Sequence, residues 1–380
     1  MQPHYSPMHG EPLPAGMPFD SYGCDCGPAC GDMGCAPLWW TRMELLLYWR
    51  QGRDFPALVT TDPADEDSET AGILPDATVL YGLDRETSQI QAGMRFDFGT
   101  WLDASQCVGI GDRLFFLGND SARFRTNSAQ NAVLSIPFFD EDTEENGGLL
   151  ISYPDLLDGS VDIVSSNEVF GNDLYAKFLV CRTNSGRIDF VTGYHFSRIN
   201  ESLRFTTRST ITDIAGEFPV GTTSRTFDRF DTRNEYHGGI LGFTMEHDYC
   251  CWSLRTQLQV ALGSMHQSIA ARGASAVNVP GENPTFATGG IFTTETNIGA
   301  ITQNEFCVVP EAGVTLACHL RSGVELTVGY SFIYWSDVAR AGNAIDPTVS
   351  LGGGGERPVL AFNQADFWVQ GLNLGLACEF

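Results

Sequence analysis

Long apolar runs are missing from this sequence. No uninterrupted apolar stretch reaches the ~18–20 residues that a membrane-spanning helix needs, although 43% of the residues are hydrophobic. This absence excludes helical membrane spans. It does not exclude spanning strands, because a strand that alternates apolar and polar residues hides its lipid-facing side from any average over the chain.

Positive charge is also scarce, and lysine is nearly absent. The chain carries 22 Lys and Arg against 47 Asp and Glu, a formal net charge of −25. Such a protein repels phosphate backbones, so nucleic acid is excluded as a partner. Two acidic runs, 62–69 and 140–145, predict solvated outer loops. The alternative is that they attract or bind cations at a pore mouth, although neither run has the ligand spacing of a calcium loop.

The residues that are abundant favour strands and turns. The chain has 41 Gly and 25 Phe, a composition typical of β structure. Residues 367–380 alternate between a small or polar set and an apolar set, which comprises Trp368, Gln370, Leu372, Leu374, Leu376, Cys378 and Phe380. This period of two is typical of the closing strand of an outer-membrane barrel. The terminal Phe380 is the predicted insertion signal, read by the barrel-insertion machinery.

Nine further segments show long strand patterns. With the closing strand, the ten predicted strands are 39–50, 89–102, 106–118, 172–183, 187–199, 232–247, 251–272, 304–320, 323–337 and 367–380. Asp112 falls on the apolar face of the third strand, which predicts a bulge or a shifted register there. Many inward positions are glycine, which either leaves room for water or relieves strand curvature.

The connections between these strands alternate in length. Tight turns are predicted at 103–105, 184–186, 248–250 and 321–322. Long polar loops are predicted at 51–88, 119–171, 200–231, 273–303 and 338–366. Short turns on one side and long loops on the other is the plan of outer-membrane barrels, in which the short turns are periplasmic.

The sequence therefore predicts an all-β fold: a ten-stranded antiparallel up-and-down transmembrane β-barrel with short periplasmic turns and long extracellular loops. The barrel spans 38–380. Aromatic girdles are expected near both strand ends, formed by Trp39, Trp40, Trp101, Tyr249, Trp252 and Phe380 at the turn side and by Trp49, Tyr236, Trp335 and Trp368 at the loop side. Membrane lipid is the predicted partner, and the oligomeric state is left open.

A head rich in cysteine, glycine and proline, 1–37, precedes the first strand. Its four cysteines are Cys24, Cys26, Cys30 and Cys35. They predict two disulfides in an oxidising compartment, with a tetrahedral zinc site as the less favoured alternative. Residues 1–20 have neither a basic region nor an apolar core, so the sequence as given shows no signal peptide. Outer-membrane placement implies that the signal has been removed or that the start is misplaced.

The chain resembles a bacterial family, the putative beta-barrel porin family seven. The resembling stretches include WWTRMELLLYW, TGYHFSRINESL, FDTRNEYHGGILGF and LTVGYSFIYWSDVARAGNAID. They cover most of the chain from about residue 39 onward. The resemblance implies an outer-membrane barrel and a pore, and it implies no catalytic residues.

Charged residues of both signs fall on the inward faces of the predicted strands. The candidate lumen-lining residues are Arg42, Glu44, Arg95, Asp97, Arg113, Lys177, Asp189, His195, Glu246, Arg255, Glu311, Glu325 and Glu379. A ten-stranded barrel is narrow enough for side chains to fill it. Two interpretations stay open: a plugged structural barrel held by internal ion pairs, and a narrow pore lined by them.

The function predicted from the sequence is passive diffusion of small cationic solutes across the outer membrane. The alternative is a non-conducting barrel whose acidic loops bind at the surface or organise the envelope. A third class, a protease site at the rim, would rest on Asp228, Asp231 and His237. Three polar residues near a loop are unremarkable and no hydrolase motif occurs, so the sequence predicts no enzyme, no cofactor and no metal site.

Overall fold

The computed structural model describes residues 37–83, 90–213, 218–320, 323–351 and 355–380. The cysteine-rich head, including Cys24, Cys26, Cys30 and Cys35, lies outside these residues, as does the turn predicted at 321–322. The described residues contain strands, turns and one short 3-10 helix, η1 (Gly342–Ala344). Within that part of the chain, no helix has the length and apolar character needed to cross a membrane.

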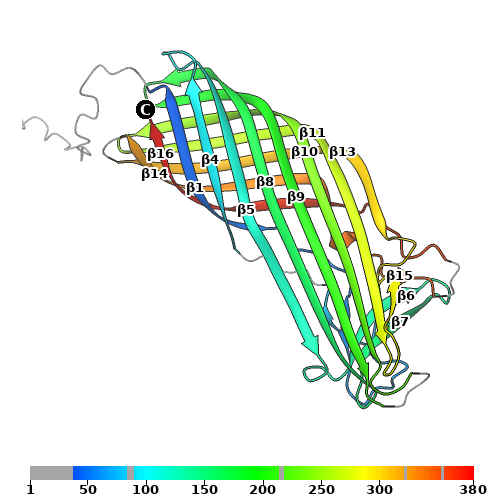
Figure 1. Cartoon of the computed structure of the whole chain (residues 1–380). Helices are drawn as coiled ribbons and strands as arrows, with labels where there is room; N and C mark the ends of the chain where they lie inside the picture. The colour runs from blue at the N-terminus through cyan, green and yellow to red at the C-terminus, as the bar shows by residue number, and fades with distance from the viewer. Residues whose placement is uncertain (1–36, 84–89, 214–217, 321–322, 352–354) are drawn as a thin grey trace, which may run out of the picture. The chain divides into compact units, whose positions relative to one another are not determined.

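Ten long strands close into one antiparallel ring (Figure 1). Each strand pairs with the next one along the chain, and the last pairs with the first: Trp40 lies opposite Glu379, and Leu46 opposite Asn373. The ring strands are β1 (Trp39–Arg50), β4 (Gln91–Trp101), β5 (Val108–Asn127), β8 (Leu157–Thr183), β9 (Gly186–Ile211), β10 (Thr223–Tyr249), β11 (Trp252–Asn278), β13 (Gly299–His319), β14 (Val324–Ala339) and β16 (Gln364–Glu379). All ten predicted strands lie in this ring.

The two ends of the ring differ. At the short-turn end, two or a few residues join β4 to β5, β8 to β9 and β10 to β11. The backbones of Trp39 and Phe380 also meet there, each amide donating to the other's carbonyl at 2.9 and 3.0 Å. The longer connections all lie at the opposite end, which we call the long-loop end.

Six neighbouring strands are longer than predicted. The strands β8, β9, β10 and β11 run for 26 or 27 residues, whereas β1 and β4 have 12 and 11. The loops predicted at 119–171, 200–231 and 273–303 are therefore partly strand. We call the outer parts of β5, β8, β9, β10, β11 and β13 the tall wall. The outward faces of these outer parts are polar. The alternation of apolar and polar residues, from which the strand ends were predicted, therefore stops before the strands do.

A second sheet occupies three of the predicted loops. It contains β2 (Val59–Thr61), β3 (Thr78–Tyr81), β6 (Leu134–Asp140), β7 (Glu145–Ser152) and β15 (Thr348–Val349), in the order β15-β6-β2-β3 with β7 beside β6. A further short strand, β12 (Thr285–Thr288), extends the edge of β11. The second sheet lies at the long-loop end (Figure 1). Its apolar side chains pack with those of the tall wall's inner face, such as Phe205 and Phe230.

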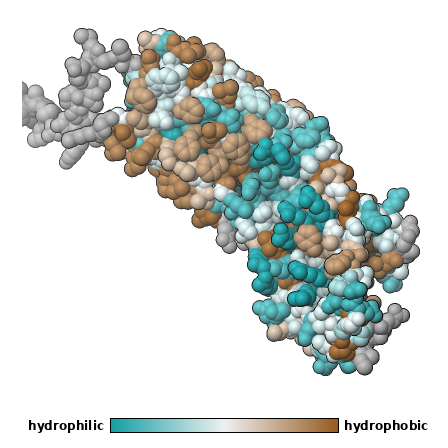
Figure 2. Space-filling model, viewed as in Figure 1, coloured by the Kyte–Doolittle hydropathy of each residue, from teal (hydrophilic) through white to brown (hydrophobic). Residues whose placement is uncertain are grey.

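Side chains alternate between the two faces of the ring strands. On β14, Leu326 is 54% exposed and Thr327 is 5% exposed. Outward apolar side chains gather over the half of the ring near the short-turn end, and hydrophilic residues are more frequent on the visible surface beyond it, mixed with neutral and some apolar ones (Figure 2). We call the outward apolar zone the apolar belt.

The structure corrects the prediction of a bulge or shifted register at Asp112. The pairing of β5 with β4 and β8 is regular from Val108 to Leu117, and the irregularity lies between Leu117 and Asp120. Asp112 therefore lies on the outward face, where it accepts a hydrogen bond from the side-chain amide of Asn172. The amide of Asn172 thus gives the outward Asp112 carboxylate a hydrogen-bond partner on the neighbouring strand, which the alternation within one strand could not show.

Candidate functional site

A polar cavity of about 110 Å³ lies inside the ring near the short-turn end. Of the thirteen candidate lumen residues, eleven line it: Arg42, Glu44, Arg95, Asp97, Arg113, Lys177, Asp189, Glu246, Arg255, Glu311 and Glu379. The other two contact residues of the interior. His195 is hydrogen-bonded to Asp173, and Glu325 forms an ion pair with Arg255.

Aromatic rings occupy the space beside two of the inward glycines. A Cβ atom at Gly99 would lie 2.1 Å from the indole of Trp40, and one at Gly111 would lie 2.7 Å from the ring of Tyr175. Neither position can carry a larger side chain without displacing a ring. These glycines thus make room for aromatic side chains, rather than for water.

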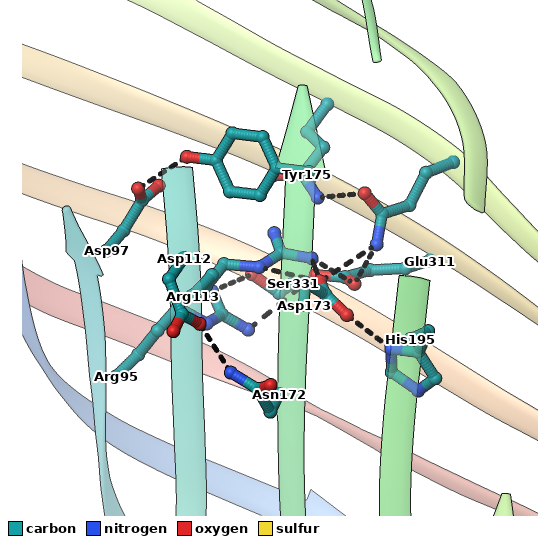
Figure 3. A network of polar contacts seen from close by, with 12 residues as sticks. Arg95, Asp97, Asp112, Arg113, Asn172, Asp173, Tyr175, His195, Glu311 and Ser331 are labelled. Carbon is teal, nitrogen blue, oxygen red and sulfur yellow. Dashed lines mark hydrogen bonds and ion pairs between the residues drawn. The ribbon is translucent and has the colours of Figure 1, made fainter. Parts of the chain in front are cut away.

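Ion pairs cross the lumen at the inner limit of the cavity (Figure 3). Arg113 of β5 contacts Glu311 of β13 at 2.8 Å, and these two strands are on opposite sides of the ring. Arg113 also pairs with Asp173 of β8. Arg95 of β4 approaches Glu311 at 3.8 Å and Glu44 at 3.3 Å. All of these side chains are buried, so the charges are satisfied by one another.

Other charges in the cavity are less completely paired. Arg187 binds Asp189 on its own strand, and Arg255 binds Glu246 at 2.6 Å. Arg42 and Lys177 form no ion pair within 4.0 Å among the described residues. The ammonium of Lys177, the sole lysine of the sequence, lies 4.9 Å from the Trp40 ring centre.

The formal charges lining the cavity balance. Its cationic residues are Arg42, Arg95, Arg113, Lys177, Arg187 and Arg255, and its anionic residues are Glu44, Asp97, Asp189, Glu246, Glu311 and Glu379. Asp173 and Glu325, which pair with Arg113 and Arg255 beside the cavity, add two acids to this part of the interior. It therefore accounts for only a small part of the net charge of −25. The sequence interpretation missed Asp173 and Arg187, although both fall on the inward alternation of strands it had identified.

An apolar layer closes the lumen next to the ion pairs, toward the long-loop end. Nine of the ten ring strands contribute to it, with Leu46, Tyr48, Phe115, Leu117, Val169, Ile199, Tyr236, Ile240, Ala261, Met265, Cys307, Val309, Ile333, Trp335, Val338, Phe367 and Val369. Each of these side chains is at most 4% exposed. The indole of Trp335 on β14 donates to the hydroxyl of Ser197 on β9 at 2.8 Å, which ties non-adjacent strands together across the interior.

The apolar layer corrects part of the predicted girdles. Tyr236 and Trp335 are fully buried inside the ring, and Trp40 is 4% exposed. Trp39 and Trp252 are exposed, at 53% and 38%. Trp101 also faces inward, where it lines the polar cavity and packs against Trp40. Four aromatic residues assigned to the membrane interface from sequence therefore lie in the interior.

A second seal follows at the long-loop end. Arg340, just after β14, binds Glu201 of β9 at 2.8 Å and donates to the carbonyl of Gly52 at 3.3 Å. Asn234 of β10 makes two hydrogen bonds to the backbone of Ala339, at 2.8 and 2.9 Å. The segments that leave β1 and β14 thus fold into the mouth of the ring.

The residues considered for a protease site do not come together. Asp228 points inward, where it accepts hydrogen bonds from the backbone amides of Ile291, Phe292 and Thr293. His237 points outward and contacts Tyr194. Asp231 is paired with Arg229 on the outer face. Asp228 therefore anchors a loop, on the opposite face of β10 from the other two.

The acidic runs lie away from the polar cavity. The run 62–69 follows β2, and Asp140 to Glu145 forms the turn between β6 and β7. Both belong to the long-loop end. In the part of the chain that the structure describes, no group of three or more His, Cys, Asp or Glu is arranged to hold a metal.

Six of the seven described cysteines lie at the short-turn end. Cys107, Cys181 and Cys318 are exposed there, and Cys250, Cys251 and Cys378 lie in or beside the turns. The seventh, Cys307, is buried in the apolar layer. Phe380, the predicted insertion signal, is 66% exposed.

Comparison with known proteins identifies the family. The model of the family described as "Putative beta barrel porin-7 (BBP7)" matches residues 40–380. The chain belongs to this family. Because the match covers the whole ring, the BBP7 assignment agrees with the closed antiparallel fold and with the resemblance seen in the sequence. A search of curated proteins finds no match.

Solved structures give fainter likenesses. The outer membrane protease OmpT from Escherichia coli is 10% identical, with a TM-score of 0.41 over 90% of this chain and 97% of that one. The toluene transporter TodX of P. putida is 7% identical, with a TM-score of 0.23 and 90% of each chain covered. Both scores lie below 0.5, so the assignment depends on the BBP7 match.

Proposed function

We propose that this BBP7 protein is an outer-membrane barrel that stands closed, with its long-loop end serving surface binding or envelope organisation. The observation that carries the proposal is the apolar layer. Its side chains are at most 4% exposed, nine strands contribute to it, and the Trp335–Ser197 hydrogen bond bridges it. Hydrated ions do not cross such a constriction unless its side chains move.

The outward apolar belt supports placement in the outer membrane. Three of its side chains, Leu326, Leu376 and Met43, are each at least 50% exposed. Exposing such apolar surface costs free energy in water, but it costs none in lipid. Short turns at one end and long connections at the other fit periplasmic and extracellular sides.

Passive diffusion of cations is the second candidate, favoured by the family description and by the polar cavity. It would require the apolar layer to open. Cation preference would then have to come from the acidic long-loop end, because the lining charges of the cavity balance. We further propose that the protein is not an enzyme, since Asp228 is engaged by backbone amides.

Ion conductance of the refolded protein in a planar bilayer tests the proposal, at low and high salt. We expect no discrete steps from the unmodified chain. Replacing Tyr236, Trp335 and Phe367 by Ala removes three rings from the apolar layer and is expected to raise conductance. The matched control replaces the outward Phe243, Tyr334 and Trp368 of the same three strands.

Insertion is checked in the same samples with spin labels. Labels at Leu326, Val328 and Tyr330 are expected to contact lipid, and labels at Thr327 and Gly329 are not. Cation-preferring steps from the unmodified, inserted chain would overturn the closed barrel in favour of the porin. Lipid contact at the inward positions would instead overturn the membrane placement.

A further inference from the structure

Arginines on the outer face of the tall wall stand directly opposite one another. Arg229 of β10 pairs in register with Arg204 of β9 on one side and with Arg272 of β11 on the other. Four residues along β10, Arg225 lies opposite Arg208 of β9. We call these five residues the arginine rows.

The arginine rows face outward. Their strand neighbours Phe205, Phe230 and Ala271 are at most 1% exposed and belong to the apolar cluster inside the ring. Alternation along a strand then places the intervening arginines on the outer face. Figure 2 shows hydrophilic residues covering much of the visible outer surface beyond the apolar belt.

Few acids offset these charges. Among the described residues, Asp231 is the one carboxylate within 4.0 Å of the arginine rows, and it binds Arg229. Among the same described residues, no ion pair is formed by the other four arginines of the rows: Arg204, Arg208, Arg225 and Arg272. Other outward arginines are paired: Arg123 and Arg125 with Asp162, and Arg198 and Arg233 with Glu235.

Like charges directly opposite on neighbouring strands destabilise a sheet. The arrangement is unexpected in a chain of net charge −25, where carboxylates are plentiful and basic residues few. An external anion that joins the rows would relieve the repulsion. Rows four residues apart along a strand are about 13 Å apart, a spacing that suits a ligand with several negative charges.

The position of the rows narrows the class of ligand. On β9 the last outward apolar residue is Phe196, and Arg204 lies eight residues farther along, about 26 Å of strand. That distance places the rows beyond the level of lipid headgroups. We propose that the arginine rows bind an anionic polysaccharide at the cell surface through its phosphate, sulfate or carboxylate groups.

This proposal rests on the proposed outer-membrane placement for its biological setting, but its test does not. The full-length protein, refolded in neutral detergent, is titrated against fluorescent dextran sulfate, polygalacturonate and neutral dextran. The test variant carries Arg204→Gln, Arg208→Gln, Arg225→Gln and Arg272→Gln. We expect both anionic glycans to bind the unmodified chain, and the variant to bind about tenfold more weakly, with a shallower salt dependence.

The matched control carries Arg123→Gln, Arg125→Gln, Arg198→Gln and Arg233→Gln. It removes the same charge from the same wall but from arginines that already have partners, and we expect less than about a threefold change. Equal weakening in both variants would reduce the effect to net charge and overturn the proposal. So would absence of binding to either anionic glycan, or a row-dependent affinity for anionic phospholipid vesicles in place of the glycans.

The variants are compared only when folded, as shown by a β-sheet circular dichroism spectrum and by the heat-dependent gel mobility of the barrel. Failure of the membrane proposal would appear in the lipid contact of the spin labels and leave glycan binding intact. Failure of the arginine proposal would leave the lipid contact intact. The two results are therefore separable.

Discussion

Ion pairs between single side chains cross the lumen, and Glu311 takes part in most of these contacts. Its carboxylate contacts Arg113 at 2.8 Å and accepts a hydrogen bond from Gln259 at 2.8 Å, while Arg95 lies 3.8 Å away. A buried charge that loses its partner costs more than the pair itself contributes. The stability of this region therefore depends on the balance of the network rather than on any one pair.

Glu311→Gln tests this balance. We expect the free energy of unfolding in detergent to fall by about 3 kcal/mol, because two buried guanidinium groups lose a shared counter-charge. Urea unfolding followed by tryptophan fluorescence measures it. Glu305→Gln on the same strand is the control, because Glu305 forms no ion pair with any described residue. It should change the free energy of unfolding by under about 0.5 kcal/mol. Equal effects would remove Glu311 from its bridging role.

The arginine rows give a second prediction at this scale. Arg272→Gln removes one of three like charges in register and is expected to stabilise the protein by about 0.5 kcal/mol at low salt. The gain should vanish at high salt, where exposed charges are screened. Arg233→Gln, which breaks a pair with Glu235, should show no such gain. Thermal unfolding at two salt concentrations decides between these outcomes.

Among the elements, the segment that follows β14 is fixed by one carboxylate. Asp346 accepts hydrogen bonds from the amides of Val359 at 2.9 Å and Thr348 at 3.0 Å, and from Arg357 at 2.7 Å. Burial alone would raise the pKa of Asp346, but these donors outweigh it and hold the pKa below its ordinary value. The carboxylate therefore links the segments before and after β15.

The lowered pKa predicts how this link responds to acid. Its contribution to stability is complete above the unfolded pKa of about 3.9 and is lost as the pH falls through the lower folded value. We expect the amides of Thr348 and Val359 to exchange hydrogen faster below about pH 4, after correction for intrinsic rates. Asp346→Asn should show fast exchange already at pH 6. Exchange independent of pH in the unmodified chain would contradict the prediction.

The sequence predicted the ring strands well and the elements between them poorly. Alternation located β1, β14 and β16 to within a few residues, because both faces of these strands have a consistent character. The strands of the second sheet are short and pair with segments far away in the chain, as Thr60 does with Ser135. Their apolar residues are buried by the tall wall, a contact that no local pattern reports.

The candidate site was predictable where it depended on alternation alone. The same rule that placed Arg95 and Glu311 inward would also have placed Tyr236 and Trp335 inward, but aromatic residues near a strand end were taken as interface residues. The distance across the ring decides whether inward side chains meet. That distance depends on the number of strands and on their stagger. The stagger cannot be read from the sequence, so a narrow pore and a plugged barrel both remained possible.

At the scale of the whole ring, six of the seven described cysteines lie at the short-turn end. If the short-turn end is periplasmic, a membrane-impermeant maleimide should label Cys107, Cys181 and Cys318 only after the outer membrane of intact cells is permeabilised. Cys307, buried in the apolar layer, should react only on unfolding. Mass spectrometry of the labelled peptides reads out each site. Labelling of Cys107 in intact cells would reverse the assigned orientation.

The unequal height of the ring affects how large molecules can contact the protein at its long-loop end. Strands of 26 or 27 residues on one side and of 11 or 12 on the other differ by roughly 50 Å in contour length at about 3.3 Å per residue. The ring is thus taller on the side of β8, β9, β10 and β11 than on the side of β1 and β4. The arginine rows lie on this taller side, so a large molecule can contact them without reaching the apolar layer inside the ring.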